Sequence, residues 1–495
     1  MIPWLTHHVL TLLTFLPLAG GAVVLLLPRK EEASIKGTAL GTTVLVLLLN
    51  LWIAPLFFGV SSAFEFTEKI IWIPAFNIYY SLGVDGVSFL LILLTNLLMP
   101  LAVLCSWREI QKQLKEYMFL ILVLQTGMVG TFAALDLFCF YIFWEVMLIP
   151  MYFLIGVWGS GNRIMAAFKF VLYTMVGSVL MLVAILYIYF KAGKSFDLTQ
   201  WWKISFSFQE QFWLFLAFGL AFAIKVPVFP FHTWLPDAHT EAPTAGSVLL
   251  AGILLKMGTY GFYRFAIPLF PQAVHYFTPA ILTLAVIGIV YGSLVAMVQV
   301  DVKRLVAYSS VAHLGFVMLG LFVLNQKGAE GAVLQMLNHG LSTGALFLLV
   351  GMIYERRHTR LIADYGGIAK VIPLYTFFFL FVTLSSIGLP GLNNFIGEFL
   401  ILLGSFQAKP VFAAVAVTGV VLSAVYMLWM VERVFFGEVR FEANRTLKDL
   451  GLREVVILVP LCAFMLGIGI YPKPILNKIH ASTAAFVELA TRISK

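Results

Sequence analysis

Six ionisable side chains lie well inside apolar segments of this sequence, where charge is costly. They are Glu145, Lys225, Lys256, His313, His339 and Glu398. A charge at the centre of a bilayer costs about 2.5–3.5 kcal/mol on insertion scales, so a purely structural bundle would rarely carry six. Histidine titrates near neutral pH, and a desolvated lysine can release its proton when a neighbouring carboxylate moves. These residue types favour stepwise proton transfer, and no aspartate-rich cage for sodium is evident.

Each of the six also has a structural interpretation. A single histidine in a membrane helix is often a hydrogen-bonded core residue, which makes His313 and His339 the weaker candidates. The two lysines are stronger candidates because both lie too deep to reach the interface easily. Glu145 needs a partner at that depth, and we expect a salt bridge to Lys225.

The stretch from Phe222 to Lys256 combines intramembrane charge with a broken helix. Pro227 and Pro230 follow Lys225, and each lacks an N–H, so the carbonyls of Ala223 and Val226 are expected to lose their helical partners. Broken helix is tolerated in a membrane only against protein or a water-filled cavity. Charge beside such a break is typical of an ion pathway.

A second break is expected at Pro390, inside an apolar segment that also contains Glu398. Proline here frees the carbonyl of Ser386, and glycines flank it. Two interrupted helices, one in each half of the chain, point to an internal structural repeat.

The composition indicates a polytopic membrane protein. Of 495 residues, 61% are hydrophobic and 11% are charged, and the mean hydropathy is +0.96. Soluble proteins carry about 25% charged residues. The net charge of +8 fits basic cytoplasmic loops better than nucleic-acid binding. The three cysteines are far apart and no nucleotide-binding glycine motif occurs, so we expect no cofactor and no metal in this chain.

Fourteen apolar segments predict an all-α polytopic membrane protein with 14 transmembrane helices. They span roughly 9–28, 37–58, 84–106, 117–135, 137–158, 165–190, 211–230, 245–267, 276–299, 304–324, 329–353, 373–403, 411–436 and 455–471. We expect four regions: helices 1–3 in 1–116, five-helix repeats in 117–267 and 268–436, and a C-terminal helix and tail in 437–495. Since five is odd, the second repeat must be inverted relative to the first.

Orientation follows from the basic residues of alternating loops. The loops opposite the N-terminus hold 18 lysines and arginines, against 10 on the N-terminal side. Cytoplasmic loops are the basic ones, so both termini are expected on the periplasmic side of a bacterial inner membrane.

Other polar residues have weaker interpretations. Asp136 and Asp301 flank tight loops and are expected to cap helices or to pair locally. Lys169 and Arg264 are expected to snorkel from helix ends. The polar break after Pro230 contains His232, Asp237, His239 and Glu241. Those four residues either line an entrance or form a solvated loop, and their spacing is poor for zinc.

Three runs of the sequence resemble the antiporter-like membrane subunits of respiratory complex I. They are IKVPVFPFHTWLPDAHTEAPTAGSVLLAGILLKMGTYG, VDVKRLVAYSSVAHLGF and MLNHGLSTGALF. The resemblance covers nearly the whole chain, and the first run is highly specific. Within that family, Glu398 and the chain length are similar to one branch of subunits. That branch carries glutamate in the second broken helix, where sister subunits usually carry lysine.

The resemblance implies a proton-translocating subunit of NADH–quinone oxidoreductase, driven by redox chemistry in other subunits. It implies partners among the membrane and peripheral subunits of that complex, including sister antiporter-like subunits. Glu145 and Lys225 would control protonation, and a relay would run from Lys225 through Lys256, His313 and His339 to Glu398. The alternatives are a subunit of a multisubunit cation/proton antiporter or of a membrane-bound hydrogenase-type complex, and a non-conducting scaffold.

Overall fold

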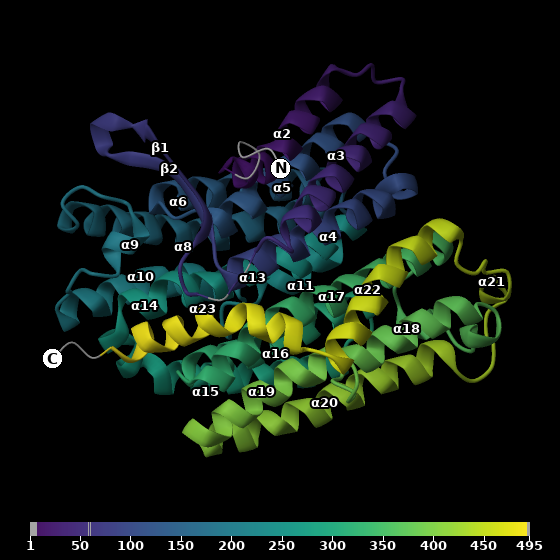
Figure 1. Ribbon diagram of the computed structural model, residues 1–495. Coiled ribbons are helices and arrows are strands. Elements are labelled where there is room, and N and C mark those ends of the chain that lie inside the picture. Colours follow the sequence, from purple (N-terminus) through teal and green to yellow (C-terminus); the bar gives the residue numbers. More distant parts are fainter. Residues whose placement is uncertain (1–6, 58, 60, 493–495) are drawn as a thin grey trace.

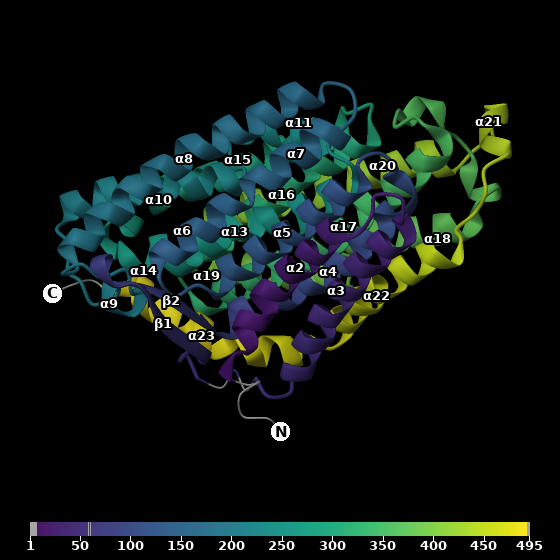
Figure 2. The same cartoon turned by 90° about the horizontal axis from the view of Figure 1, so that it is seen from above.

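Long helices lying side by side dominate the computed structural model (Figures 1 and 2). The structure describes residues 7–57, 59 and 61–492. Residues 1–6 and 493–495, the ends of the two expected terminal regions, lie outside the described residues. Within the described part of the chain, twelve helices are long and apolar enough to cross a membrane. A polytopic, mostly helical membrane protein is therefore confirmed.

The first half of the chain contains α2 to α14. The long helices are α2 (Val9–Leu26), α3 (Glu32–Ile53), α4 (Gly86–Glu109), α5 (Leu114–Ala133), α8 (Arg163–Lys191) and α10 (Phe208–Lys225). The expected segment 137–158 is divided into α6 (Leu137–Val146) and α7 (Leu148–Trp158). Shorter helices are α9 (Leu198–Trp201), α11 (Trp234–Glu241), α12 (Thr244–Leu249), α13 (Leu255–Gly261) and α14 (Ile267–Leu269).

The second half contains α15 to α23. The long helices are α15 (Pro271–Met297), α16 (Val302–Phe322), α17 (Gln326–Arg357), α18 (Pro373–Ser386), α19 (Asn393–Ala408), α20 (Pro410–Phe435), α22 (Leu452–Ile470) and α23 (Lys473–Thr491), and α21 (Glu442–Arg445) is short. Each of the fourteen expected segments overlaps at least one of these helices. The count of fourteen crossings and the inverted repeats stay predictions.

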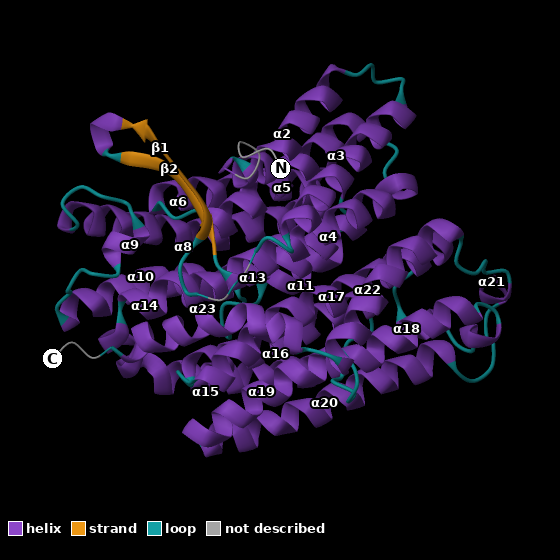
Figure 3. Cartoon of the chain, in the orientation of Figure 1, coloured by secondary structure: helices purple, strands orange, loops and turns teal. Residues whose placement is uncertain are grey.

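Two elements were not expected from the apolar segments. Strands β1 (Glu65–Ile73) and β2 (Ile78–Val84) form an antiparallel hairpin at the edge of the helix bundle (Figure 3). Helix α23 is amphipathic and packs against α17 and α4, and Ile479 and Phe486 are among its buried residues. A search for continuous apolar runs misses both, because strands and one-sided helices alternate apolar with polar residues.

Both expected helix breaks are present. Helix α10 ends at Lys225, just before Pro227, and α18 ends at Ser386, before Pro390. At the first break, the Ala223 carbonyl has no helical partner in Pro227, which lacks an N–H, and accepts a hydrogen bond from the next residue, the Val228 N–H, at 2.9 Å. The indole N–H of Trp234 donates to the neighbouring Ile224 carbonyl at 3.0 Å.

Buried amides support the second break. Asn394 Nδ2 donates to the Ser385 carbonyl at 2.9 Å, and Ser385 Oγ donates to Asn393 Oδ1 at 2.6 Å. Asn338 on α17 donates to the Asn393 carbonyl at 2.7 Å. Side chains thus donate to backbone carbonyls on both sides of the break, which makes the break tolerable at membrane depth.

Candidate functional site

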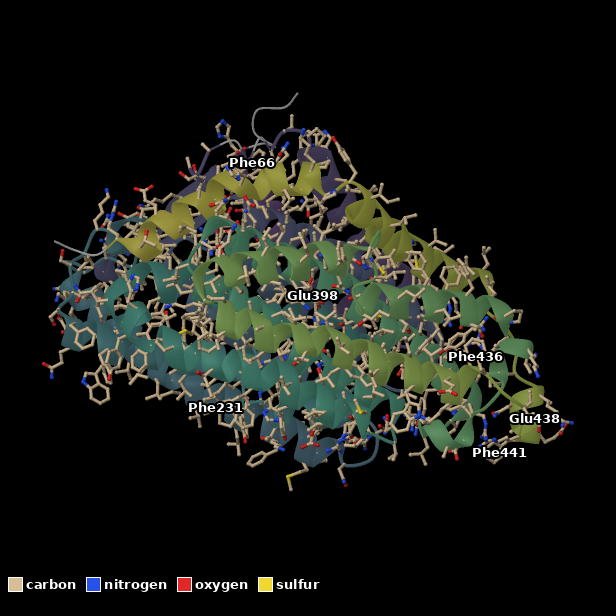
Figure 4. The ribbon with its side chains drawn as sticks, turned by 90° about the horizontal axis from the view of Figure 1, so that it is seen from below. Phe66, Phe231, Glu398, Phe436, Glu438 and Phe441 are labelled. Atoms are coloured by element: carbon tan, nitrogen blue, oxygen red, sulfur yellow. The ribbon has the colours of Figure 1, made fainter. Side chains whose placement is uncertain are left out.

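Four of the six expected residues form one continuous buried row, Lys256–His339–His313–Glu398. Lys256 Nζ lies 2.6 Å from His339 Nδ1. The rings of His339 and His313 have centroids 5.7 Å apart. His313 Nδ1 lies 2.8 Å from Glu398 Oε1. Each of the four side chains is at most a few per cent exposed, and Glu398 lies deep within the helix bundle (Figure 4).

The order of the two histidines differs from the expected relay. The sequence-based relay places His313 next to Lys256, whereas the structure places His339 there and His313 next to Glu398. The expected order is therefore wrong. Position along the chain carries no information about which of two helices, α16 or α17, lies nearer to α13.

Four different helices position the row, one residue each: α13, α17, α16 and α19. The helix that carries Lys256 contains a π-helical turn at Leu250–Leu254. Lys256 Nζ donates to the carbonyl of Ala251 in that turn. Such local widening of a helix is frequent at functional sites, and here it provides a backbone acceptor for the buried ammonium.

Two glycines allow the lysine and histidine helices to approach. A Cβ atom on Gly340 would lie 2.9 Å from the carbonyl oxygen of Gly252. Gly340 follows His339 directly, and Gly252 lies one turn before Lys256. Any larger residue at Gly340 would separate the two backbones and lengthen the contact between Lys256 and His339.

The Glu398 carboxylate ends the row with a second donor. Gln335 Nε2 donates to Glu398 Oε1 at 3.0 Å. The same carboxylate lies beside the break, because a Cβ on Gly388 would be 3.3 Å from Glu398 Oε2. Gly388 has φ +75°, a conformation that glycine adopts without strain. The row therefore ends where backbone is interrupted.

Lys225 and Glu145 do not form the expected salt bridge. No ion pair within 4.0 Å joins these two described residues. Lys225 Nζ is buried without a hydrogen-bond partner among the described residues and lies 5.1 Å from the ring centroid of Trp144 and 5.7 Å from that of Phe170. Glu145 is half-buried, and it still interacts electrostatically with Lys225. Aromatic faces, which attract cations, therefore surround the ammonium group of this lysine.

Sequence reasoning missed one buried ion pair. Arg264 was expected to snorkel, but its Nη2 lies 2.5 Å from Asp85 Oδ1, and both side chains are buried. Lys169, the other residue expected to snorkel, has a side chain that is 30% exposed, and its Nζ contacts Asp237 Oδ2 at 2.7 Å. The local sequence around a charged residue does not indicate which charged residue of a distant segment will pair with it.

The expected caps at Asp136 and Asp301 are confirmed. Asp136 Oδ1 accepts from the N–H groups of Phe138 and Cys139 at the start of α6. Asp301 Oδ1 accepts hydrogen bonds from the backbone N–H groups of Lys303 and Arg304 at the start of α16. Burial raises the pKa of Asp136 to about 6, although these hydrogen bonds oppose the rise.

Among the residues of the polar break, His239 is the most deeply buried. Its side chain is inaccessible, and it stacks on Phe347 with centroids 4.7 Å apart. Neither ring nitrogen has a hydrogen-bond partner within the described chain. The interpretation as a solvated loop is wrong for this residue. Within the described ranges, no group of three or more His, Cys, Asp or Glu residues is placed to hold a metal ion.

Comparisons with known proteins identify the family of this chain. Residues 134–423 match the family model described as "NADH:quinone oxidoreductase/Mrp antiporter, TM", and residues 35–131 match "NADH-ubiquinone oxidoreductase chain 4, amino terminus". The chain is 47% identical over 482 residues to NADH-ubiquinone oxidoreductase chain 4 of Chondrus crispus, with 97% of each chain covered. It is also 47% identical over 500 residues to NADH-quinone oxidoreductase subunit M of Rhodobacter capsulatus, again with 97% of each covered.

Solved structures show the same architecture. A chain of respiratory complex I from Thermus thermophilus with bound NADH is 35% identical with a TM-score of 0.90, and the match covers 97% of this chain and 99% of that one. A chain of the Mrp complex from Dietzia sp. is 20% identical with a TM-score of 0.86, covering 99% and 100%. The latter likeness shows the fold alone.

Proposed function

We propose that this chain, which belongs to the NADH:quinone oxidoreductase/Mrp antiporter family of membrane subunits, moves protons along the row from Lys256 to Glu398. It is a proton-translocating membrane subunit of NADH–quinone oxidoreductase, of the type named subunit M or chain 4, and it assembles with other subunits of that enzyme. The redox reaction that drives it takes place in those other subunits.

The observation that carries the proposal is the contact chain Lys256–His339–His313–Glu398. Its outer links are of hydrogen-bond length, 2.6 and 2.8 Å. The middle link joins two rings 5.7 Å apart, and the Nε2 atom of each ring has no partner among the described residues. A proton can cross that link through a bridging water or a rotation of either ring, because proton transfer needs hydrogen-bonded contact.

Burial of the row supplies the gate that a pump requires. Moving a proton across a membrane potential costs about 2.3 kcal/mol per 100 mV, so an open pore would dissipate the gradient. The row is enclosed in protein on all sides, with Glu398 only 4% exposed. Protons must then enter and leave one at a time, when a terminal residue gains or loses contact with water.

Glu145 and Lys225 act on this row through charge and not through direct contact. Lys225 Nζ lies over the rings of Trp144 and Phe170, and the Glu145 carboxylate attracts it from a distance greater than 4.0 Å. Neutralising or displacing that carboxylate would destabilise the ammonium and favour release of its proton. Glu145 is half-buried on α6, where a neighbouring subunit can reach it.

The greater likeness to the quinone-reductase subunits favours this function over a cation/proton antiporter. Relatives named as subunit M or chain 4 are 47% identical, and the Mrp chain is 20% identical. The excess of Lys and Arg in the loops after α2, α4 and α17 supports a cytoplasmic location for that side. We therefore place both termini on the periplasmic side of a bacterial inner membrane.

The decisive experiment removes the centre of the row. In membrane vesicles that contain the assembled complex, Lys256→Ala should abolish NADH-driven proton pumping while the amount of assembled complex stays unchanged. The alternative scaffold function requires the opposite result, normal pumping by this variant.

A further inference from the structure

Two polar cavities lie where α4 ends and α12 begins, on the side of the basic loops, and Glu109 lines both. The larger has a volume of about 700 Å³ and includes Arg108, Glu355 and His358 in its wall. The smaller has a volume of about 250 Å³ and is walled by Glu241, Thr244, Lys303 and Arg360. Tyr354 also lines both cavities. Glu109 thus stands at the boundary between an outer and an inner polar space.

The two oxygens of the Glu109 carboxylate have different surroundings. Oε1 accepts hydrogen bonds from the backbone N–H and the hydroxyl of Thr244, each at 3.0 Å. Oε2 is buried and has no hydrogen-bond partner in the described part of the chain. One oxygen therefore anchors the side chain to the helix that leads to Lys256, and the other is available to accept a proton.

A set of buried titratable groups continues from the inner cavity to the row. Lys303, in the cavity wall, is 7% exposed and its Nζ donates to the Ala242 carbonyl at 2.5 Å. His239, on α11, is inaccessible to solvent, and both of its ring nitrogens are unpartnered among the residues described. His239 interacts electrostatically with both Lys303 and Lys256. Lys303 contacts the carbonyl of Ala242, three residues after His239, and the Ser247 hydroxyl on α12 donates to the His239 carbonyl at 2.9 Å. His239 therefore links the wall of the inner cavity to the helix that leads to Lys256.

We infer that Glu109 collects protons from the solution on the basic-loop side and delivers them, through the inner cavity and His239, to Lys256. Each step transfers one proton between two chemical groups: from water in the outer cavity to Glu109 Oε2, from Oε2 to water in the inner cavity, from that water to a ring nitrogen of His239, and from His239 to the neutral amine of Lys256. This inference rests on the proposed function, because it names the entrance to the same row.

The structural alternative is that Glu109 only caps the helix at Thr244. Glu109→Gln separates the two roles, since the amide oxygen can still accept both Thr244 bonds but the side chain can no longer carry a proton. Glu109→Asp keeps the acid but shortens the reach to Thr244. Glu116→Gln is a matched control, because Glu116 lies on the same side in an exposed pair with Arg29 at 2.6 Å.

The test uses membrane vesicles with the whole complex, normalised to NADH:ferricyanide activity, and follows membrane potential during NADH oxidation. We expect Glu109→Gln to slow the generation of potential by about tenfold or more, Glu109→Asp to retain most of it, and Glu116→Gln to match the wild type. Acetate, a small weak acid that fits the inner cavity, should partly restore Glu109→Gln. Potential is the readout because a permeant acid dissipates only the pH gradient.

Three results would overturn the inference. Wild-type rates in Glu109→Gln, with Lys256→Ala inactive, would remove the entrance and leave the proposed function standing. If Glu109→Gln and Glu109→Asp generate potential equally slowly, and acetate does not restore the rate, Glu109 only caps the helix at Thr244. Normal rates in both Glu109→Gln and Lys256→Ala would reject the proposed function as well.

Discussion

Replacing Glu398 with glutamine tests the terminal link of the row most sharply. The carboxylate accepts two hydrogen bonds at Oε1, from His313 at 2.8 Å and from Gln335 at 3.0 Å. Glutamine has almost the same shape, so packing around the second break is preserved while the charge is lost. The variant therefore isolates the electrostatic contribution of this side chain.

The expected magnitude follows from those two bonds. A hydrogen bond to a charged group is worth about 1 kcal/mol more than a neutral one, so Glu398→Gln loses about 2 kcal/mol of stabilisation for a proton held at this end of the row. At 1.4 kcal/mol per tenfold change, that corresponds to a pumping rate roughly 30-fold lower. Glu398→Asp keeps the charge and should lose less.

The assay is NADH-driven pumping in inverted membrane vesicles, with assembled complex measured in parallel. Glu432→Gln is the matched control, since Glu432 lies on α20 with its side chain exposed. If Glu398→Gln pumps at the wild-type rate in a fully assembled complex, the Glu398 charge has no part in transfer and the row ends elsewhere.

Three further predictions address the other parts of the site. His339→Leu should reduce pumping more than His339→Ala, because leucine excludes the water that can bridge Lys256 to His313; equal loss would argue against a hydrated link. Glu145→Ala should slow pumping severely and Glu145→Asp only in part. The lost attraction between Glu145 and Lys225 is less than about 4 kcal/mol, the value for two charges 4 Å apart near a protein surface. Normal pumping by the alanine variant would show that Glu145 has no part in the mechanism. Because the pKa of Asp136 is raised to about 6, its contribution to stability is full below pH 4 and is lost as pH rises through 6, at most about 3 kcal/mol. Asp136→Asn should flatten that dependence in thermal inactivation of the solubilised complex, and an unchanged slope would contradict it.

Much of the architecture was predictable because it depends on properties of single residues and their near neighbours. Apolar runs marked the long helices, and prolines marked the two breaks, since a missing N–H interrupts a helix wherever it occurs. The capping of α6 by Asp136 followed from the same kind of local chemistry. The hairpin β1–β2 and the amphipathic α23 escaped because their apolar residues alternate with polar ones.

The sequence by itself determined which residues are candidates for the chemistry: six ionisable groups inside apolar segments, where a charge is costly in a bilayer. Only the tertiary structure decided how they meet. His339 and not His313 touches Lys256, because Gly252 and Gly340 let α17 approach the lysine helix. Lys225 rests on aromatic rings instead of Glu145, and Arg264 finds Asp85 across 179 residues of chain. Spacing along one helix is set by local geometry, whereas contacts between helices depend on crossing points that no short stretch of sequence encodes.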